Sequence, residues 1–462
     1  MIDFKNISAA YFVGIGGIGM SALARYFISK GRIVAGYDRT RSSITDALEK
    51  EGCTVTYIDD PQSIPSLYTE VLPKEKMLIV FTPAIPPENR ILDFFRTNGY
   101  YVYKRSEVLG EISKHTDTIA VAGTHGKTSV STLIAHIFYS SKAGCSAFLG
   151  GISCNYETNL LLSDSRFTVM EADEFDRSFH RLSPLVAVIT SADADHLDIY
   201  GDYMTMLEAY NEFCRKIRMG GTLVLNEAVK CIIKTPENIK VFTYGFSGES
   251  SFRIRNVRRD NDFYVFDLVY SGGELNNLAY RFPGLKNIEN AAAASSVALL
   301  CRIAEEDIRN ALKSFAGVRR RFDIRINKPG LVYIDDYAHH PEEIKAFITA
   351  VRGHYGTRKI TAIFQPHLYS RTRDHADGFA AILDQLDEVI LLPVYPAREK
   401  PIEGVSSAMI FEKMKLANKK MLEMKDLPAA LDVDKLDILL TIGAGDIDRL
   451  VAPIEEALNR MR

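Results

Sequence analysis

The sequence predicts an α/β protein of three domains, in which the first and last are Rossmann-like and the middle one carries a β-rich excursion. Three observations lead to this fold class. Short apolar runs of strand length alternate with helical patterns along most of the 462 residues. Two glycine-rich turns each stand between such a run and a helix. Several apolar runs also end in polar clusters, as buried parallel strands do. We expect domains over residues 1–107, 108–322 and 323–462.

The first block opens with a glycine fingerprint for a diphosphate. An apolar strand, Tyr11–Val13, is followed by G-I-G-G-I-G, a helix and a second strand that ends at Asp38. In this βαβ pattern the helix N-terminus and close backbone approach bind a diphosphate. NAD and a UDP-linked compound both fit that geometry, so both remain open. The residues expected at this site are Gly14, Gly16, Gly17, Ile18, Gly19 and Asp38.

The second block begins with the stretch D-T-I-A-V-A-G-T-H-G-K-T-S-V at residues 117–130. An apolar run ends in a compact glycine turn, and Lys127-Thr128 then begins a helix. In a phosphate loop of this kind, backbone amides surround a triphosphate, the lysine reaches the β/γ oxygens and the hydroxyl can hold Mg²⁺. The first glycine of the usual spacing is replaced by Val121, and a tight turn with a surface lysine is the alternative. The expected ATP-binding residues are Gly123, Thr124, His125, Gly126, Lys127, Thr128 and Ser129. The central domain is therefore predicted to be P-loop ATPase-like.

Two acidic clusters follow the next strands of this block. Glu171 comes first in E-A-D-E-F-D, and a carboxylate at a strand end beside a phosphate loop usually completes Mg²⁺ coordination. The following strand ends in D-A-D-H-L-D, where His196, flanked by Asp193, Asp195 and Asp198, is a candidate ligand for a second divalent ion. A solvated acidic turn and an ordinary loop histidine are the alternatives.

The end of the central block carries a β-rich stretch, a helix and a basic run. Alternating residues from about Lys240 to Pro283 predict an antiparallel excursion inserted in or attached to the α/β domain. The next helix carries Asn287 and Asn290 on one face, where they can address a purine edge or cap and pack the helix. The run Arg319, Arg320 and Arg321 is either a phosphate clamp or a basic linker.

The third block again alternates strands with polar loops, which predicts another parallel sheet. Ligands gather at the carboxyl ends of such strands, and two loops there carry chemistry-bearing residues. D-D-Y-A-H-H-P at residues 335–341 ends a strand and begins a helix, and H-L-Y-S-R follows the next strand. An arginine in the second loop can bind a carboxylate bidentately. The alternative is that both segments are ordinary surface loops. The candidates are Tyr337, His339, His367 and Arg371.

Composition narrows the classes of function. A formal net charge of −3 and the lack of a long basic block argue against a nucleic-acid-binding protein. Six cysteines without a C-x-x-C pair fit a reducing compartment. No signal peptide or apolar segment of membrane-spanning length is evident, so we expect a cytoplasmic protein without membrane insertion.

Taken in order, the motifs resemble the Mur ligase family of peptidoglycan synthesis over essentially the whole chain. The series is GIGGIGM, GTHGKTS, EADE, DHLD, the Asn287/Asn290 helix, GVRRRFD, DDYAHHP, QPHLYSRT and GAGD. GIGGIGM and RRRFD look like the members that add L-alanine, and members that attach a tripeptide to the same nucleotide sugar are the alternative. An NAD-dependent oxidoreductase is the alternative from another class.

The resemblance implies an ATP-dependent ligase. The carboxylate of UDP-N-acetylmuramate would attack ATP to give an acyl phosphate, which the amine of L-alanine would then attack. Thr128, Glu171 and His196 would hold two Mg²⁺ ions, Asn287 and Asn290 would address adenine, and Arg321 would contact phosphate. The first domain would bind the UDP sugar, and Tyr337, His367 and Arg371 the amino acid. The implied catalytic residues are Lys127, Glu171, His196, Arg320 and His339. A monomer or weak homodimer is expected.

The chain departs from the family pattern at three positions. Lys286 stands where a histidine commonly precedes the first asparagine of the adenine helix, Leu368 stands where arginine often follows QPH, and Asp193 replaces a glutamate. These departures affect adenine stacking and amino-acid recognition and leave the phosphate loop intact.

Overall fold

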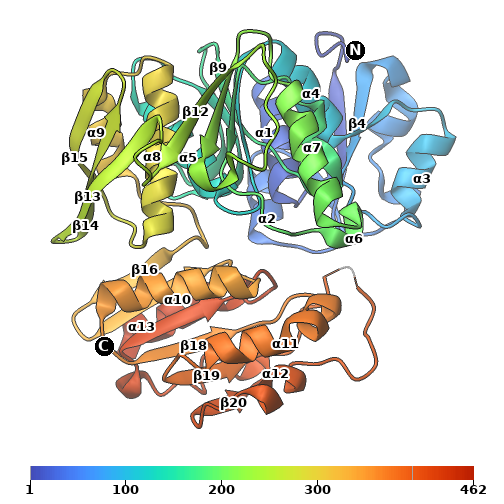
Figure 1. Ribbon diagram of the computed structural model, residues 1–462. Helices are drawn as coiled ribbons and strands as arrows, with labels where there is room; N and C mark the ends of the chain where they lie inside the picture. Colours follow the sequence, from blue (N-terminus) through green and yellow to red (C-terminus); the bar gives the residue numbers. More distant parts are fainter. Residues whose placement is uncertain (1, 398, 462) are drawn as a thin grey trace. The chain divides into compact units, whose positions relative to one another are not determined.

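The computed structural model describes residues 2–397 and 399–461, without the side chains of residues 197, 198 and 461. Over these residues the strands form three sheets, which confirms the predicted α/β class (Figure 1). The chain divides into two compact units. The first comprises the residues up to Arg281 and Glu289–Ala316, and holds the first two sheets. The second comprises Phe282–Ile288 and the chain from Gly317 onward, and holds the third sheet. The domain boundaries near residues 107 and 322 stay predictions.

The first sheet is parallel, in the order β3-β2-β1-β4-β5. Its central strand β1 is buried on both faces because alternate side chains enter two apolar clusters: Phe12 packs near Phe27 on one face, and Tyr11 packs against Tyr68 and Phe95 on the other. Its strands are β1 (Ala9–Val13), β2 (Ile33–Tyr37), β3 (Thr54–Thr56), β4 (Met77–Phe81) and β5 (Val102–Lys104); its helices are α1 (Ile18–Ser29), α2 (Ser43–Lys50), α3 (Arg90–Thr97) and α4 (Arg105–Lys114).

The second sheet runs in the order β15-β14-β13-β12-β11-β10-β6-β9-β7-β8. Strand β6 lies between the parallel strands β9 and β10, with Val121 opposite Glu171 and Ala122 opposite Ile189. The ends of these three strands therefore lie together, and they carry the phosphate loop and both acidic clusters. The strands are β6 (Asp117–Ala122), β7 (Ser146–Ser153), β8 (Thr158–Leu161), β9 (Phe167–Glu171), β10 (Val186–Ile189), β11 (Thr222–Asn226), β12 (Lys240–Gly245), β13 (Phe252–Asp260), β14 (Phe263–Tyr270) and β15 (Gly273–Tyr280).

The β-rich stretch continues this sheet and is only partly antiparallel. Strands β13, β14 and β15 form antiparallel pairs as predicted. The prediction is wrong for β12, which pairs in parallel with β11 and, through two residues, with β13. Strand β12 follows its neighbour through a crossover, so it extends the parallel sheet before the hairpins begin. The helices of this part are α5 (Lys127–Ser140), α6 (Leu197–Tyr200), α7 (Tyr203–Arg215), α8 (Leu285–Leu300) and α9 (Glu305–Ser314).

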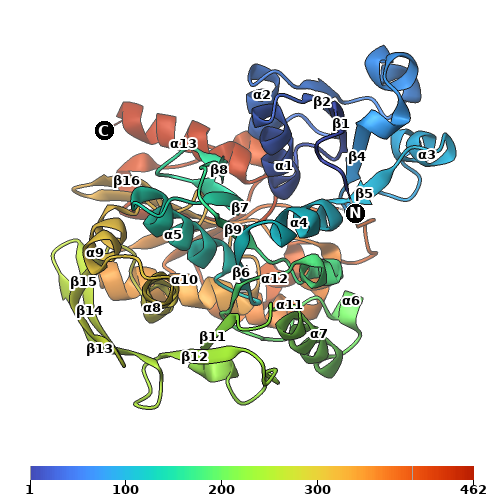
Figure 2. The same ribbon diagram turned by 90° about the horizontal axis from the view of Figure 1, so that it is seen from above.

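Helix α1 of the first sheet packs against β7 and β8 of the second (Figure 2). Its buried residues and those of the second sheet belong to one apolar cluster, which includes Leu23, Phe148 and Leu160. This shared core holds the glycine loop of the first sheet next to the hairpin of the second.

The third sheet runs in the order β16-β17-β21-β18-β19-β20, parallel except for the β16–β17 pair. Asp336 and Phe364 both lie opposite Ile442, so the loops after β17, β18 and β21 leave the same edge. The strands are β16 (Asp323–Lys328), β17 (Leu331–Asp336), β18 (Ile360–Phe364), β19 (Glu388–Leu391), β20 (Lys419–Met421) and β21 (Ile438–Ile442); the helices are α10 (Pro341–Tyr355), α11 (Tyr369–Leu383), α12 (Ala408–Lys413) and α13 (Asp448–Met461).

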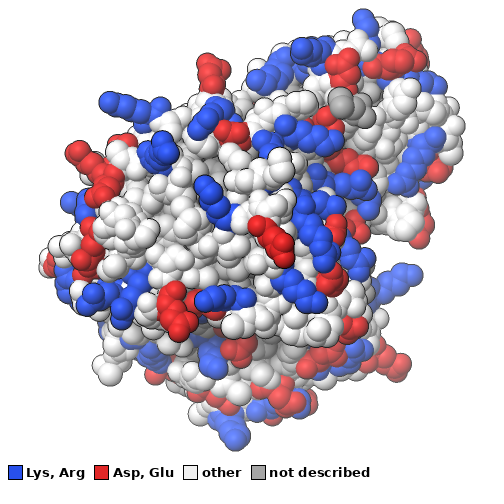
Figure 3. Space-filling model, turned by 45° about the horizontal axis from the view of Figure 1, so that its top comes forward, with Lys and Arg blue, Asp and Glu red and all other residues white. Residues whose placement is uncertain are grey.

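The surface carries charges of both signs. Basic and acidic side chains are interspersed over the face drawn in Figure 3, in keeping with the formal net charge of −3. Among the described residues, no helix combines the length and the apolar character needed to cross a bilayer.

Candidate functional site

The glycine loop after β1 is braced from within. Gly14 has φ +88°, a left-handed conformation that favours glycine, and a Cβ there would come within 2.8 Å of the Thr82 side chain. The Gly16 amide donates to Asp38 Oδ2 at 2.8 Å, and the Gly17 amide donates to the Gly14 carbonyl at 3.2 Å. Asp38 thus holds the loop in shape. The first turn of α1 begins with Ile18 and Gly19, and amides at a helix N-terminus can bind a phosphate.

The phosphate loop between β6 and α5 needs glycine at two positions. Gly123 has φ +135°, and a Cβ there would lie 2.1 Å from Thr190 Oγ1. Gly126 is the N-cap of α5 with φ +85°, and a Cβ there would approach Asn290 Oδ1 to 2.9 Å. The backbone is tied to the loop after β10, because the His125 amide donates to Ser191 Oγ at 2.8 Å. The predicted glycine turn therefore exists as a fixed loop at the N-terminus of α5, and Asn290 lies beside it.

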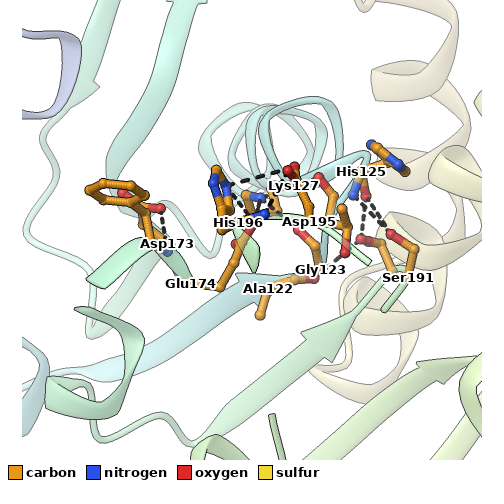
Figure 4. A network of polar contacts seen from close by, with 12 residues as sticks. Ala122, Gly123, His125, Lys127, Asp173, Glu174, Ser191, Asp195 and His196 are labelled. Carbon is orange, nitrogen blue, oxygen red and sulfur yellow. Dashed lines mark hydrogen bonds and ion pairs between the residues drawn. The ribbon is translucent and has the colours of Figure 1, made fainter. Parts of the chain in front are cut away.

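Lys127 points back into this loop, where its ammonium makes three contacts (Figure 4). Its Nζ donates to the Gly123 carbonyl at 2.6 Å, to the Thr124 carbonyl at 3.4 Å and to Glu174 Oε1 at 2.6 Å. Only 14% of the lysine side chain and 2% of the Glu174 side chain are exposed. The site therefore contains a buried ion pair in which Glu174 is the counter-ion of the lysine.

Burial and the neighbouring charges shift the pKa values of Lys127 and Glu174 in opposite directions. Burial acts to lower the pKa of Lys127, but the negative charges of Glu174 and Glu171 outweigh it, so that the pKa of the lysine is raised. Burial raises the pKa of Glu174 to about 7, although the lysine opposes that rise. Lys127 is therefore positively charged at neutral pH. The sequence pattern placed Glu174 among four acids without separating it from its neighbours.

The other acids after β9 reach in different directions. A Cβ at Gly150 of β7 would come within 2.1 Å of Glu171 Oε2, so the Glu171 carboxylate lies against the backbone of β7. Asp173 forms an ion pair with Arg105 of α4, with Oδ2 2.9 Å from Nη2. Asp176 pairs in the same way with Lys104 at 2.7 Å. Sequence reasoning missed both basic partners, which stand about seventy positions earlier and carry no local motif.

His196 lies against Glu174. Its Nε2 is 3.9 Å from Glu174 Oε1 and 3.7 Å from Asp195 Oδ2, and its backbone has φ +52° (Figure 4). The family resemblance implies that His196 and Glu171 share a metal ion, which stays a prediction, and the structure brings Glu174 close to this imidazole as well. Asp193 extends toward His125, with 3.8 Å between Oδ2 and Nε2. The side chain of Asp198 lies outside the described residues.

The donors present fit Mg²⁺ bound together with phosphates. Within the described part of the chain, no three His, Cys, Asp or Glu side chains form a metal site by themselves. Mg²⁺ at phosphate-transfer sites takes one or two protein oxygens and completes its shell with water and phosphate. Thr128, buried in the first turn of α5, and Glu171, at the end of the neighbouring β9, supply such oxygens. The imidazole of His196 suits Mg²⁺ less well.

A cavity of about 230 Å³ joins the glycine loop to the acids. The first turn of α1 lines this cavity, and so do Glu171 and Asp173. Arg105 stands between them, because a Cβ at Gly19 would come within 2.3 Å of its Nη1. The cavity therefore runs from a diphosphate-type helix N-terminus to carboxylates that stand beside the phosphate loop.

The two asparagines of α8 differ in their surroundings. Asn290 lies beside Gly126, as described above. Asn287 Nδ2 donates to the Pro283 carbonyl at 2.7 Å, which helps to close the start of the helix. Lys286, the departure from the family pattern, is exposed.

The second compact unit gathers the predicted amino-acid-binding residues at the edge of the third sheet. Arg371 Nη1 donates to His367 Nδ1 at 3.3 Å, and the rings of His367 and His339 lie 5.9 Å apart. The ring of Tyr337 packs edge-on to that of His339 at 5.4 Å. Burial and the positive charge of Arg371 lower the pKa of His339. Its Nδ1 lies 3.0 Å from the Tyr337 carbonyl, which only accepts, so Nδ1 carries the hydrogen and Nε2 is the acceptor.

The three arginines at residues 319–321 make different contacts. The Arg320 guanidinium contacts buried Asp335 at 3.3 Å and the Gly443 carbonyl, which ties the start of the unit to β17 and β21. Arg321 lies over the ring of Tyr337, with 4.9 Å to the ring centre. Arg319 pairs with Asp323 at 3.9 Å. Arg320 also lies over this ring, with 5.1 Å to its centre, so two members of the run lie beside Tyr337.

Comparisons with known proteins agree with this arrangement. Three family models match consecutive segments: "Mur ligase family, catalytic domain" at residues 9–116, "Mur ligase middle domain" at 121–298, and "Mur ligase, glutamate ligase domain" at 320–445. UDP-N-acetylmuramate–L-alanine ligase of Parabacteroides distasonis is 46% identical over 99% of this chain and 98% of its own length. The same enzyme of Phocaeicola vulgatus is 44% identical over 99% and 100%.

Solved structures show the same likeness. The UDP-N-acetylmuramate–alanine ligase of Thermotoga maritima superposes with a TM-score of 0.83 at 25% identity, covering 98% of this chain and 100% of its own. A murein peptide ligase of Psychrobacter arcticus shares the fold, with a TM-score of 0.72 at 19% identity over 98% and 99%. With relatives above 40% identity along nearly its full length and with matching models over its three sheets, the chain belongs to the Mur ligase family.

Proposed function

We propose that this protein is an ATP-dependent ligase that joins L-alanine to the carboxylate of UDP-N-acetylmuramate in peptidoglycan synthesis. The observation that carries the proposal is the cavity shared by the first turn of α1 and the acids after β9. A sugar nucleotide with its diphosphate on α1 would direct its carboxylate along this cavity toward Glu171 and the phosphate loop. Relatives named for this substrate pair span nearly the whole chain, which supports the same assignment.

The proposed reaction has two steps. A carboxylate oxygen of the muramyl group attacks the γ-phosphorus of ATP, the bond to the ADP oxygen breaks, and an acyl phosphate forms. The amine nitrogen of L-alanine then attacks the acyl carbon and loses a proton, and inorganic phosphate leaves as the amide bond forms. Lys127 and the first amides of α5 would stabilise the negative charge on the phosphoryl group during its transfer.

Metal and nucleotide contacts follow from the same arrangement. Two Mg²⁺ ions, when bound, would neutralise charge between the carboxylate and the γ-phosphate. Thr128 and Glu171 would hold one, and Glu171 with His196 the other. Asn287 and Asn290 would address adenine.

The second compact unit would supply the amino-acid site. Arg371, supported by His367 and Tyr337, would bind the carboxylate of L-alanine, because a guanidinium can grip a carboxylate with two parallel hydrogen bonds. Arg321 or Arg320 would contact phosphate, and His339 would act at the reacting groups. The protein would act in the cytoplasm as a monomer or weak homodimer.

A mixing experiment tests the proposal. Phosphate release should require UDP-N-acetylmuramate, L-alanine, ATP and Mg²⁺ together, and the release should persist when other amino acids are added in competition. Faster release with the murein tripeptide than with L-alanine would favour the tripeptide-attaching alternative. Nicotinamide reduction without phosphate release would favour an oxidoreductase.

A substitution separates catalysis from mere nucleotide binding. Lys127→Ala should lower kcat by on the order of 10³-fold, since it removes the charge that stabilises the transferred phosphoryl group. Lys142→Ala is the matched control, because this exposed lysine stands just after the other end of α5. Equal activity of the two variants would contradict the proposed role of the phosphate loop.

A further inference from the structure

The side-chain amide of Asn159 joins the β7–β8 hairpin to the first turn of α1. Asn159 is fully buried. Its Nδ2 donates to the Ile18 carbonyl at 2.5 Å and to Ser21 Oγ at 3.0 Å, and its Oδ1 accepts from Arg25 Nη1 at 2.5 Å. The partners fix the orientation of the amide, because a carbonyl only accepts and a guanidinium only donates. Both ends of the amide are therefore used.

The contacts around Asn159 make this link stiff. Ser21 is itself fully buried, and its Oγ donates to the Ile18 carbonyl at 2.9 Å. Arg25 forms a bidentate ion pair with Glu51, which follows α2, with Nε–Oε2 and Nη2–Oε1 distances of 2.8 and 2.9 Å. A buried polar network whose donors and acceptors are matched holds its members in one arrangement. The first turn of α1 is thus bonded to the second sheet as well as packed against it.

The bonded turn forms one wall of the cavity, and strand β7 of the same hairpin forms another. Ile18 lines the cavity from α1, and Phe148 and Gly150 line it from β7. The Glu171 carboxylate lies against Gly150. A rotation of α1 about the hairpin would therefore change the distance between the diphosphate-type helix end and Glu171.

We infer that Asn159 is a positioning residue for the sugar-nucleotide half of the reaction. Through the Ile18 carbonyl it sets the separation between the first turn of α1 and the acids at the other end of the cavity. That separation decides whether the diphosphate and the carboxylate of one sugar nucleotide can bind at the two ends of the cavity at the same time. The inference rests on the proposed function, and it assigns Asn159 no contact with substrate.

The same hairpin provides a matched control. Asn155 Nδ2 donates to the Ser314 carbonyl at 2.9 Å, and its Oδ1 accepts from the Ala316 amide at 2.8 Å. Asn155→Ala therefore removes hydrogen bonds of the same kind from the same hairpin without touching α1. Asn159→Ala should raise the KM for UDP-N-acetylmuramate about tenfold, since a displacement of about 1 Å has large effects on bound geometry. The KM for ATP should change less than twofold, and Asn155→Ala should leave both KM values within twofold.

A second variant covers the case in which Asn159→Ala folds poorly. Ser21→Ala removes one hydroxyl from the same network and should raise the KM for UDP-N-acetylmuramate about threefold, as expected for one hydrogen bond. A purely structural role would lower Tm and the fraction of active enzyme, which reduces kcat and leaves both KM values unchanged. That result, or equal effects of the Asn159 and Asn155 variants, would overturn the inference. If the unaltered enzyme failed to release phosphate with UDP-N-acetylmuramate, the proposed function would fail instead.

Discussion

The buried imidazole of His136 should make the protein less stable as the pH falls. His136 lies on α5, nine residues after Lys127, and only 4% of it is exposed. Its Nδ1 is 2.8 Å from the Tyr156 hydroxyl and its Nε2 is 3.0 Å from Ser314 Oγ. Ser314 Oγ donates to the Ala311 carbonyl, so it accepts from Nε2–H, and the Tyr156 hydroxyl donates to Nδ1. These partners suit the neutral ring.

The size of the effect follows from the pKa. Burial lowers the pKa of His136 from 6.5 to about 4 in the folded protein. Between these values the unfolded chain binds a proton that the folded protein does not bind, so stability falls as the pH falls through this range. At about 1.4 kcal/mol for each tenfold in proton affinity, the full difference is about 3 kcal/mol. Lowering the pH from about 7.5 to about 5 should remove about 2 kcal/mol of it.

Urea unfolding at the two pH values measures this loss, and a variant isolates its source. His136→Gln cannot titrate, so its free energy of unfolding should fall by about 2 kcal/mol less than that of the unaltered protein over the same pH change. His115→Gln is the control, because the His115 side chain is 65% exposed, and this variant should behave like the unaltered protein. Identical pH dependence in the His136 variant and the unaltered protein would refute the reasoning.

Three further predictions concern the site. Glu174→Gln should lower Tm in the absence of nucleotide, because an unpaired buried ammonium costs about 3 kcal/mol or more. Saturating MgADP should narrow the difference in Tm between this variant and the unaltered protein, since phosphates then pair with Lys127. An unchanged difference in Tm would contradict this. Arg371→Lys should raise the KM for L-alanine at least about tenfold and leave the KM for ATP within twofold, since lysine cannot form the bidentate contact; an equal rise in both would place Arg371 elsewhere. EDTA should stop phosphate release and added Mg²⁺ should restore it, whereas release that continues in EDTA would exclude the metal role.

The sequence predicted the parts of the fold that depend on local pattern. The first strand was expected at Tyr11–Val13 and lies within β1, and α5 begins at Lys127 as expected. The unusual glycine spacing of the phosphate loop also has a local cause. Val121, which replaces the usual first glycine, is still inside β6 and opposite Glu171 and Val188, and Gly123 is the first residue of the loop with positive φ. The strand simply extends to the point where the turn begins.

Contacts between distant segments were beyond the reach of sequence reasoning. Asn159 stands in a hairpin without motif character, and nothing near it in sequence points to Ile18, 141 positions away. The sequence shows four acids within residues 171–176, and Glu174 is one of them. It does not show which of the four the backbone turns toward the lysine. Asp176 and Arg177 have φ of +53°, which no residue type there predicts. Contacts with distant residues separate the acids: Asp173 and Asp176 pair with Arg105 and Lys104, and Glu174 pairs with Lys127.

The charges of the site explain why acids surround a loop that would bind a triphosphate. A lysine that must meet phosphates has to be charged before they arrive, yet burying an ammonium without a partner costs several kcal/mol. Glu174 supplies that partner and, with Glu171, raises the pKa of Lys127, so the lysine is protonated without any phosphate beside it. When phosphates bind to Lys127, Glu171 and Glu174 would be negative charges beside negatively charged substrates. Mg²⁺ held at Glu171 would offset them. The acids thus need a cation both without and with bound phosphates. Lys127 is that cation in the absence of phosphates, and Mg²⁺ would be that cation in their presence.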